Sequence, residues 1–93
     1  MGEGSFKAAK GLIKTNVQVY KQTILSIQIS GDFFMYPEDS LWELEHELKG
    51  ITARKDHILK IIQQFYRHKQ ILTPGVTAED FTEAILRGIA NMQ

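Results

Sequence analysis

The stretch IKTNVQVY, residues 13–20, decides how the fold begins, because β-branched and polar residues alternate along it. This period of two is typical of a half-buried β-strand. The residues predicted on its apolar face are Ile13, Thr15, Val17 and Val19. The alternation resumes over residues 24–30, where Leu25, Ile27 and Ile29 are predicted to share one face and Ile24 to lie on the other. Two such runs predict an antiparallel hairpin, and the link Lys21-Gln22 leaves the turn type open because it has no glycine.

Three helical patterns follow the hairpin. The first begins near Pro37, carries Leu41, Leu44 and Leu48 on one face and stops near Gly50. The second has Thr52 as a candidate cap and a stripe formed by Ile58, Ile61, Ile62 and Phe65. The third begins at Thr77, which with Asp80 resembles a capping box. Its apolar stripe consists of Phe81, Ala84, Ile85, Gly88, Ile89 and Met92.

The remaining segments carry weaker signals. Residues 1–6 have two glycines and no clear period, which predicts a loose arm. The apolar pair Ile71-Leu72 fits either a short third strand or an extended link. We therefore predict one α+β domain over residues 1–93: a small antiparallel sheet, made of the hairpin and this possible third strand, with about three helices packed on one face.

Composition excludes several classes of protein. The 93 residues carry 11 basic and 11 acidic side chains and therefore no formal net charge, which argues against a general nucleic-acid or membrane-surface binder. No cysteine is present, which rules out disulfides and thiol chemistry and fits a reducing cytoplasm. No apolar run approaches a membrane span, and the first ten residues lack the apolar core of a signal peptide. We expect a cytoplasmic chain.

Catalytic signatures are missing from the sequence. It has no phosphate-binding P-loop, no dinucleotide-binding glycine pattern and no nucleophile elbow. His57 and His68 are too far apart on one helix to share a metal, and His46 lies on another helix. Glu43 and Glu47 could pair for acid–base work, but a solvated helix face is the usual explanation. We therefore predict no catalytic, cofactor-binding or metal-binding residue in this chain.

The segment DFFMYP, residues 32–37, is unusual for a loop because it concentrates three aromatic residues and a methionine. Neighbouring residues of an extended chain point in opposite directions, so Phe33 and Phe34 cannot both enter one core. Either some of these side chains reach a second surface, or the loop folds over the sheet edge and buries them all. Gly31 permits a positive φ, and Asp32 is expected to fix the turn by accepting backbone N–H groups.

These residues carry a resemblance to a known family. SIQISGDFF, residues 26–34, resembles the I-x-I-x-GDFF signature of the accessory, C-terminal domain of lipoate–protein ligases. The segments 7–14, 36–38, 44–50 and 76–81 also resemble that domain, in the same order. The sequence departs from the family at residues 20–23, where a glycine-containing turn is expected.

The resemblance implies a role without catalysis by this chain alone. Lipoate–protein ligases use ATP to activate lipoate to lipoyl-AMP and then acylate a lysine of a carrier domain. The accessory domain is a separate small chain in archaeal-type enzymes, where adenylation requires it. A 93-residue chain that begins with Met1 is expected to be this separate subunit. ATP, Mg²⁺ and lipoate are then expected in the catalytic subunit, and this chain contacts carrier domains only indirectly.

We expect the surface that meets the catalytic subunit to include the aromatic segment and two lysines near the N-terminus. Its predicted members are Lys7, Lys10, Asp32, Phe33, Phe34, Met35 and Tyr36. Two alternatives remain: a small nucleic-acid-binding module, in which a sheet carries base-stacking aromatics, and a ligand-sensing domain. Against the first, Tyr20 is the single aromatic residue within the two clear strands.

Overall fold

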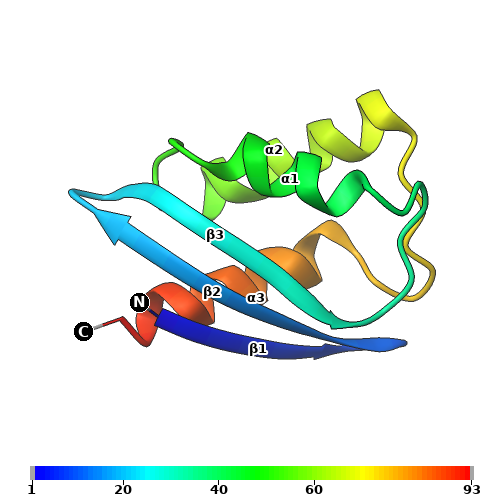
Figure 1. The fold of residues 1–93 in the computed structure, drawn as a ribbon, viewed down its shortest axis with the longest axis horizontal. Helices are drawn as coiled ribbons and strands as arrows, with labels where there is room; N and C mark the ends of the chain where they lie inside the picture. Colours follow the sequence, from blue (N-terminus) through cyan, green and yellow to red (C-terminus); the bar gives the residue numbers. More distant parts are fainter. Residues whose placement is uncertain (1, 93) are drawn as a thin grey trace.

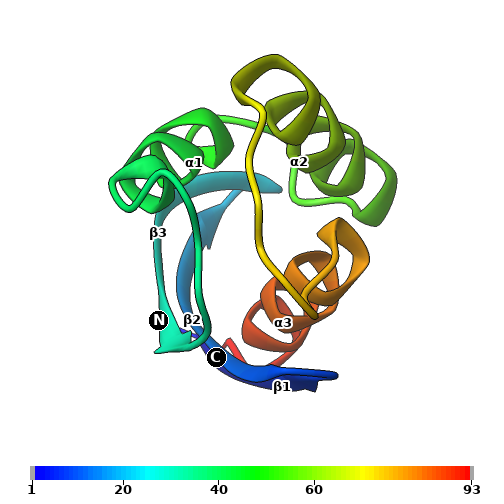
Figure 2. The ribbon, with the colours of Figure 1, turned by 90° about the vertical axis from the view of Figure 1, so that its right-hand side faces the viewer.

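The computed structural model describes residues 2–92 as a three-stranded antiparallel sheet with three helices. The strands are β1 (Gly2–Ala8), β2 (Gly11–Tyr20) and β3 (Thr23–Asp32), in the spatial order β1-β2-β3. The helices are α1 (Ser40–Leu48), α2 (Lys55–Lys69) and α3 (Ala78–Ala90). The sheet curves around the helices, which all lie on its concave side (Figures 1 and 2). The predicted α+β class, with helices on one face, is confirmed.

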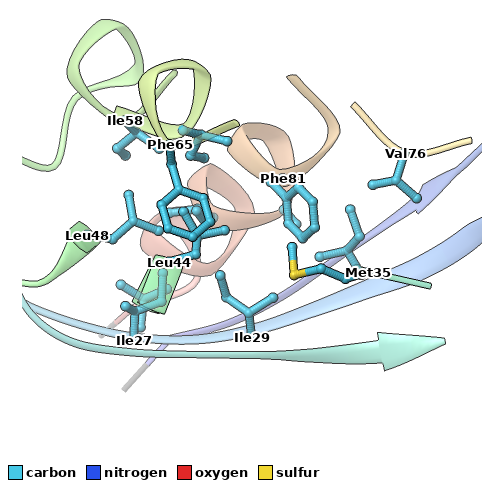
Figure 3. Close-up of a cluster of buried hydrophobic side chains, with 14 of the residues drawn as sticks. Ile27, Ile29, Met35, Leu44, Leu48, Ile58, Phe65, Val76 and Phe81 are labelled. Atoms are coloured by element: carbon cyan, nitrogen blue, oxygen red, sulfur yellow. The ribbon is translucent and has the colours of Figure 1, made fainter. Parts of the chain in front are cut away.

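The core lies between the concave face of the sheet and the three helices. Helix α3 packs on β1 and β2, α1 packs on β3, and α2 bridges α1 and α3. Of the predicted apolar residues of β2, Ile13, Thr15 and Val17 are buried and Val19 is half-buried. In Figure 3, Ile58 and Phe65 of α2 and Phe81 of α3 form the wall opposite Ile27 and Ile29 of β3. The largest fully buried side chains include Ile13, Ile24, Leu44, Ile62 and Phe81.

The N-terminal segment is the largest departure from the sequence-based prediction. Residues 2–8, which include most of the predicted loose arm, form the edge strand β1, while Met1 lies outside the described residues. The two glycines, Gly2 and Gly4, let β1 approach α3 closely instead of making the segment mobile. A Cβ on Gly4 would overlap the backbone N of Gly88 in α3. The third strand therefore lies at the N-terminus. The pair Ile71-Leu72 forms no strand, and Leu72 contributes an isolated bridge to Tyr36.

Side chains of α3 and of its C-cap residue, Asn91, close the free edge of β1. The Arg87 guanidinium donates to the carbonyl oxygen of Ser5 (3.1 Å), and the Asn91 amide donates to that of Glu3 (2.8 Å). Arg87 also lies over the ring of Phe6, 4.9 Å from its centroid. These contacts satisfy backbone acceptors that would otherwise be open to pairing with another chain.

The hairpin forms as predicted, but one face assignment is wrong. Gln18 pairs with Ser26 and Val19 pairs with Ile24, so Leu25 is the extra residue of a β-bulge. The bulge shifts the alternation by one residue, which buries Ile24 and exposes Leu25. The turn holds two non-glycine residues in left-handed conformation, Lys21 (φ 50°) and Gln22 (φ 64°). Positive φ at both central residues is the pattern of a type I′ turn.

The helix boundaries agree only in part with the predictions. Helix α1 starts at Ser40 rather than Pro37, because residues 37–39 form a turn in which Ser40 N–H donates to the Pro37 oxygen (3.1 Å). Thr52 does not cap α2; it forms a bridge with Thr23, and Arg54 is the N-cap residue. The capping box of α3 is confirmed, since Thr77 and Asp80 exchange side-chain-to-backbone hydrogen bonds of 2.9 and 3.1 Å.

Candidate interaction surface

The aromatic segment connects β3 to α1 at one end of the sheet, beside the α2–α3 loop (Figures 1 and 2). Gly31 precedes it with φ 142°, and a Cβ there would overlap the carbonyl oxygen of Leu12 on β2. The positive φ predicted for this glycine is confirmed, and the position excludes other residues. The chain therefore leaves β3 in a direction that only glycine permits.

Two side chains of the segment enter the core. The Phe33 ring packs edge-on against Phe81, with ring centroids 5.3 Å apart and an interplanar angle of 83°. Met35 is 8% exposed, and its side chain points into the cluster around Phe81 (Figure 3). Phe33 is partly buried, so both residues attach the segment to α3 and the sheet. These two members of the predicted interface are chiefly core residues.

The other two side chains point away from the core. Phe34 is 68% exposed and Tyr36 is 49% exposed. The backbone of Tyr36 pairs with that of Leu72, whose side chain is also exposed, through N–H···O contacts of 2.9 and 3.0 Å. This pairing fixes the outward-facing aromatics against the α2–α3 loop. The sequence left open whether the loop buries all of these side chains or directs some of them to a second surface. The structure shows the second arrangement, with two side chains in the core and two exposed.

The α2–α3 loop is itself fixed by buried hydroxyl groups. The Thr73 hydroxyl donates to the Val76 carbonyl oxygen (2.8 Å) and therefore accepts from the Tyr66 hydroxyl (2.6 Å). Burial raises the pKa of Tyr66 above its ordinary value of 10. The loop that supports Leu72, and through it Tyr36, thus depends on a protonated tyrosine.

A shallow groove of about 440 Å³ runs between the end of β3, the aromatic segment and the start of α1. Its lining is apolar apart from Ser30 and Glu38 and comprises Ile29, Gly31, Phe33, Phe34, Met35, Tyr36 and Leu41. Trp42, in the first turn of α1, is 77% exposed. Phe34 and Tyr36, which border this groove, and Leu72, whose backbone pairs with that of Tyr36, are hereafter called the aromatic surface. Exposed apolar clusters of this kind mark interaction sites.

Neither Leu72, a member of the aromatic surface, nor the exposed Trp42 was predicted to be a site residue. A signal for Trp42 was present: it follows Leu41, a member of the predicted apolar stripe, and precedes the acidic Glu43. An aromatic residue so large on the outer side of an amphipathic helix contributes little to the fold. Leu72 carried no such signal, because its exposure depends on the bridge to Tyr36.

The three charged candidates lie at the same end of the sheet. Asp32 pairs with Leu12, and Lys7 pairs with Leu12 from the other side. Lys10 lies in the β1–β2 turn, where its N–H donates to the Gly75 carbonyl oxygen (3.2 Å). All three side chains are exposed. Within residues 2–92 the Asp32 carboxylate has no hydrogen bond, so its expected turn-fixing contact is absent and Gly31 alone explains the turn.

The acidic residues of α1 have separate roles. Glu45 accepts a hydrogen bond from the backbone N–H of Ile29 (2.6 Å) and so occupies part of the free edge of β3. Glu43 forms an ion pair with Lys69 (3.4 Å). Glu47 is exposed. The suggested acid–base pair of Glu43 and Glu47 is therefore a solvated helix face with one surface ion pair.

The convex face of the sheet is polar. Successive cross-strand rows carry Glu3, Asn16 and Gln28, then Ser5, Lys14 and Ser30. Tyr20, at the hairpin turn, is the aromatic residue exposed from β2, and Lys21 lies 5.4 Å from its ring centroid. This face does not offer the row of aromatic rings with which sheet proteins stack bases.

Residues 2–92 hold no cluster of three or more metal-binding side chains, and His46, His57 and His68 are separately exposed. Over the same residues, none of the helices combines the length and the apolar character that crossing a bilayer requires.

The fold and the aromatic surface define a class: a small α+β domain that presents rigidly held aromatic side chains at one end of its sheet. Comparison with known proteins makes this more specific. Residues 3–85 match the family described as the bacterial lipoate protein ligase C-terminus. The chain belongs to this family, which confirms the resemblance inferred from the sequence.

Two relatives from Thermoplasma acidophilum extend the comparison. Lipoate-protein ligase A subunit 2 is 46% identical over 81 residues, which cover 87% of this chain and 83% of the relative. A chain solved in the structural analysis of a bi-partite lipoate protein ligase and its E2 lipoyl domain superposes with a TM-score of 0.82 at 43% identity. That superposition covers 89% of this chain and 91% of the solved one.

Proposed function

We propose that this chain is the accessory subunit of a two-chain lipoate–protein ligase. It binds the catalytic subunit and enables that subunit to activate lipoate with ATP before transfer to a lysine of a carrier domain. The observation that carries the proposal is the likeness to a ligase subunit 2 over almost the whole chain. The aromatic surface supports it, because exposed rings held on a rigid loop are typical anchors of protein interfaces.

The proposal includes a division of labour between the two chains. ATP, Mg²⁺ and lipoate bind to the catalytic subunit, and the heterodimer forms in the cytoplasm without nucleic acid or membrane. The accessory chain favours adenylation by binding an adenylation-competent arrangement of its partner more tightly than other arrangements. As a separate chain it needs an extended interface, about 1,600 Å² in total for one of standard size.

Lipoate-dependent release of pyrophosphate from ATP tests the proposal. The catalytic subunit is assayed with and without this chain, with both proteins checked for folding by circular dichroism. We expect release only when the two chains are present together. Equal release in both samples would refute the accessory role. As a matched pair, Phe34→Ala/Tyr36→Ala is expected to raise the concentration needed for activation at least tenfold, whereas Tyr20→Ala, at the opposite end, leaves it unchanged.

A further inference from the structure

The charge around the aromatic surface is strongly one-sided. Residues 22–48 contain no lysine or arginine. The same stretch contains six carboxylates: Asp32, Glu38, Asp39, Glu43, Glu45 and Glu47. This part of the chain includes β3, the aromatic segment and α1. On the side of β3 and α1 the aromatic surface is therefore flanked by negative charge, although the whole chain is neutral.

Three of these carboxylates combine exposure with a place beside the segment. Glu45 is engaged by the backbone of Ile29, and Glu43 by Lys69. Asp32, Glu38 and Asp39 form no ion pair or side-chain hydrogen bond within residues 2–92, and all three are exposed. Glu38 lines the groove together with Phe34 and Tyr36, so a free carboxylate and two exposed rings border the same space.

Rings and carboxylates together favour one kind of ligand. The face of an aromatic ring attracts a cation, and a neighbouring carboxylate adds direct attraction. Arginine fits both, because its planar guanidinium stacks on rings while its N–H groups bond to carboxylates. We propose that the groove and the aromatic surface receive a basic segment of the catalytic subunit, with an arginine or lysine side chain over Phe34 or Tyr36 and against Glu38 and Asp39. This inference rests on the proposed function.

Contacts with the core and with the α2–α3 loop hold the aromatic surface in place before a partner binds. Phe33 and Met35 anchor the segment in the core, and two backbone hydrogen bonds hold Tyr36 against Leu72. The rings are therefore fixed before binding, which reduces the entropy lost on association. Lys7 and Lys10 lie at the same end of the sheet but on β1 and the β1–β2 turn, where they would meet acidic groups of the partner.

The dissociation constant of the two-chain complex, measured by calorimetry between low and high NaCl concentrations, tests this inference. We expect Glu38→Gln/Asp39→Asn to weaken binding about tenfold at low salt and to reduce the dependence on salt, because surface charges are screened. The control is Glu3→Gln/Asp56→Asn, which removes the same charge away from the aromatic surface, beside the middle of β2 and at the start of α2. An equal effect of both double variants, or a salt-independent affinity of the unmodified chains, would overturn the inference.

A ring-specific substitution separates cation binding from simple apolar contact. Phe34→Leu keeps apolar area but removes the aromatic face, so we expect about threefold weaker binding and a smaller effect of Glu38→Gln in that background. Unchanged affinity in Phe34→Leu would argue against a stacked cation. Self-association of the isolated chain through this surface, seen by analytical ultracentrifugation and abolished by Phe34→Leu, would also overturn the inference.

The two proposals fail in different ways. If no complex forms at any salt concentration, the accessory role itself is refuted. If a complex forms and activates lipoate but its affinity is insensitive to Glu38 and Asp39, only the basic segment is refuted.

Discussion

Phe33 and Met35 differ from their neighbours Phe34 and Tyr36 in the direction in which their side chains point. The first pair packs against Phe81 and the core, whereas the second faces solvent at the same end of the sheet. The alternation of a strand thus continues past the end of β3, with Gly31 as the point where the chain turns. A short run of apolar residues can therefore attach a loop and equip it for binding at the same time.

Truncation of the inward pair should cause the largest loss of stability. Phe33→Ala removes the edge-on contact with Phe81 and leaves a cavity, so we expect the free energy of unfolding to fall by about 3 kcal/mol. Phe34→Ala should change it by less than about 0.5 kcal/mol. Urea denaturation followed by circular dichroism measures both. Similar losses in the two variants would contradict the division between core and surface.

Gly31→Ala tests the turn that separates the pairs. The new Cβ would overlap the Leu12 carbonyl oxygen while the backbone keeps an unfavourable φ of 142°, so we expect a loss of about 2 kcal/mol. Gly50→Ala is an informative companion, because its φ is also positive (91°) but its Cβ would meet no atom within 4 Å. A smaller loss at Gly50 would isolate the steric part of the effect, and equal losses would argue against it.

Tyr66 offers a prediction on pH. Because burial raises its pKa in the folded protein, the folded state holds the proton more tightly than the unfolded state. Stability is therefore complete below about pH 10 and falls as pH rises through the folded pKa. Tyr66→Phe should remove this alkaline loss and cost about 1 kcal/mol at neutral pH through the lost Thr73 hydrogen bond. Denaturation measured from pH 7 to 11 checks the alkaline decline and the cost at neutral pH. An identical alkaline decline in the variant would show that Tyr66 is not its cause.

The smallest expected effect lies at the opposite end of the sheet. Gln22 adopts φ 64° in the hairpin turn, a conformation that glycine reaches without steric cost. Gln22→Gly should raise the free energy of unfolding by about 0.5 kcal/mol. The affinity for the catalytic subunit should stay the same, because the turn is remote from the aromatic surface. A loss of stability would show that the Gln22 side chain has contacts beyond the turn.

Sequence patterns correctly predicted those parts of the molecule whose structure depends on residues close to one another in the sequence. The inward face of β2 and the capping box of α3 are of this kind. The exposure of Leu25 was not predictable, because the bulge depends on how β2 and β3 are paired. Strand β1 was missed because Gly2 and Gly4 act through their approach to α3, at the other end of the sequence.

The candidate surface was predictable as a segment but not residue by residue. Its apolar composition indicated a second surface, and the period of two excluded a common direction for Phe33 and Phe34. Which of them faces the core depends on Phe81, almost fifty residues further along the chain. The five acidic residues of 38–47 can be read from the sequence. The structure separates Glu38 and Asp39 from two of the others, because Glu43 pairs with Lys69 and Glu45 with the backbone N–H of Ile29.

The contact between β1 and α3 also governs the order in which the domain forms during synthesis. The ribosome makes β1 before α3, and the residues that close its edge, Arg87 and Asn91, follow their partners Ser5 and Glu3 by 82 and 88 residues. Until they emerge, Gly2–Ala8 has no cover on that side. The nascent domain must therefore carry an open strand edge until α3 has been made, and its folding is complete only when α3 leaves the exit tunnel.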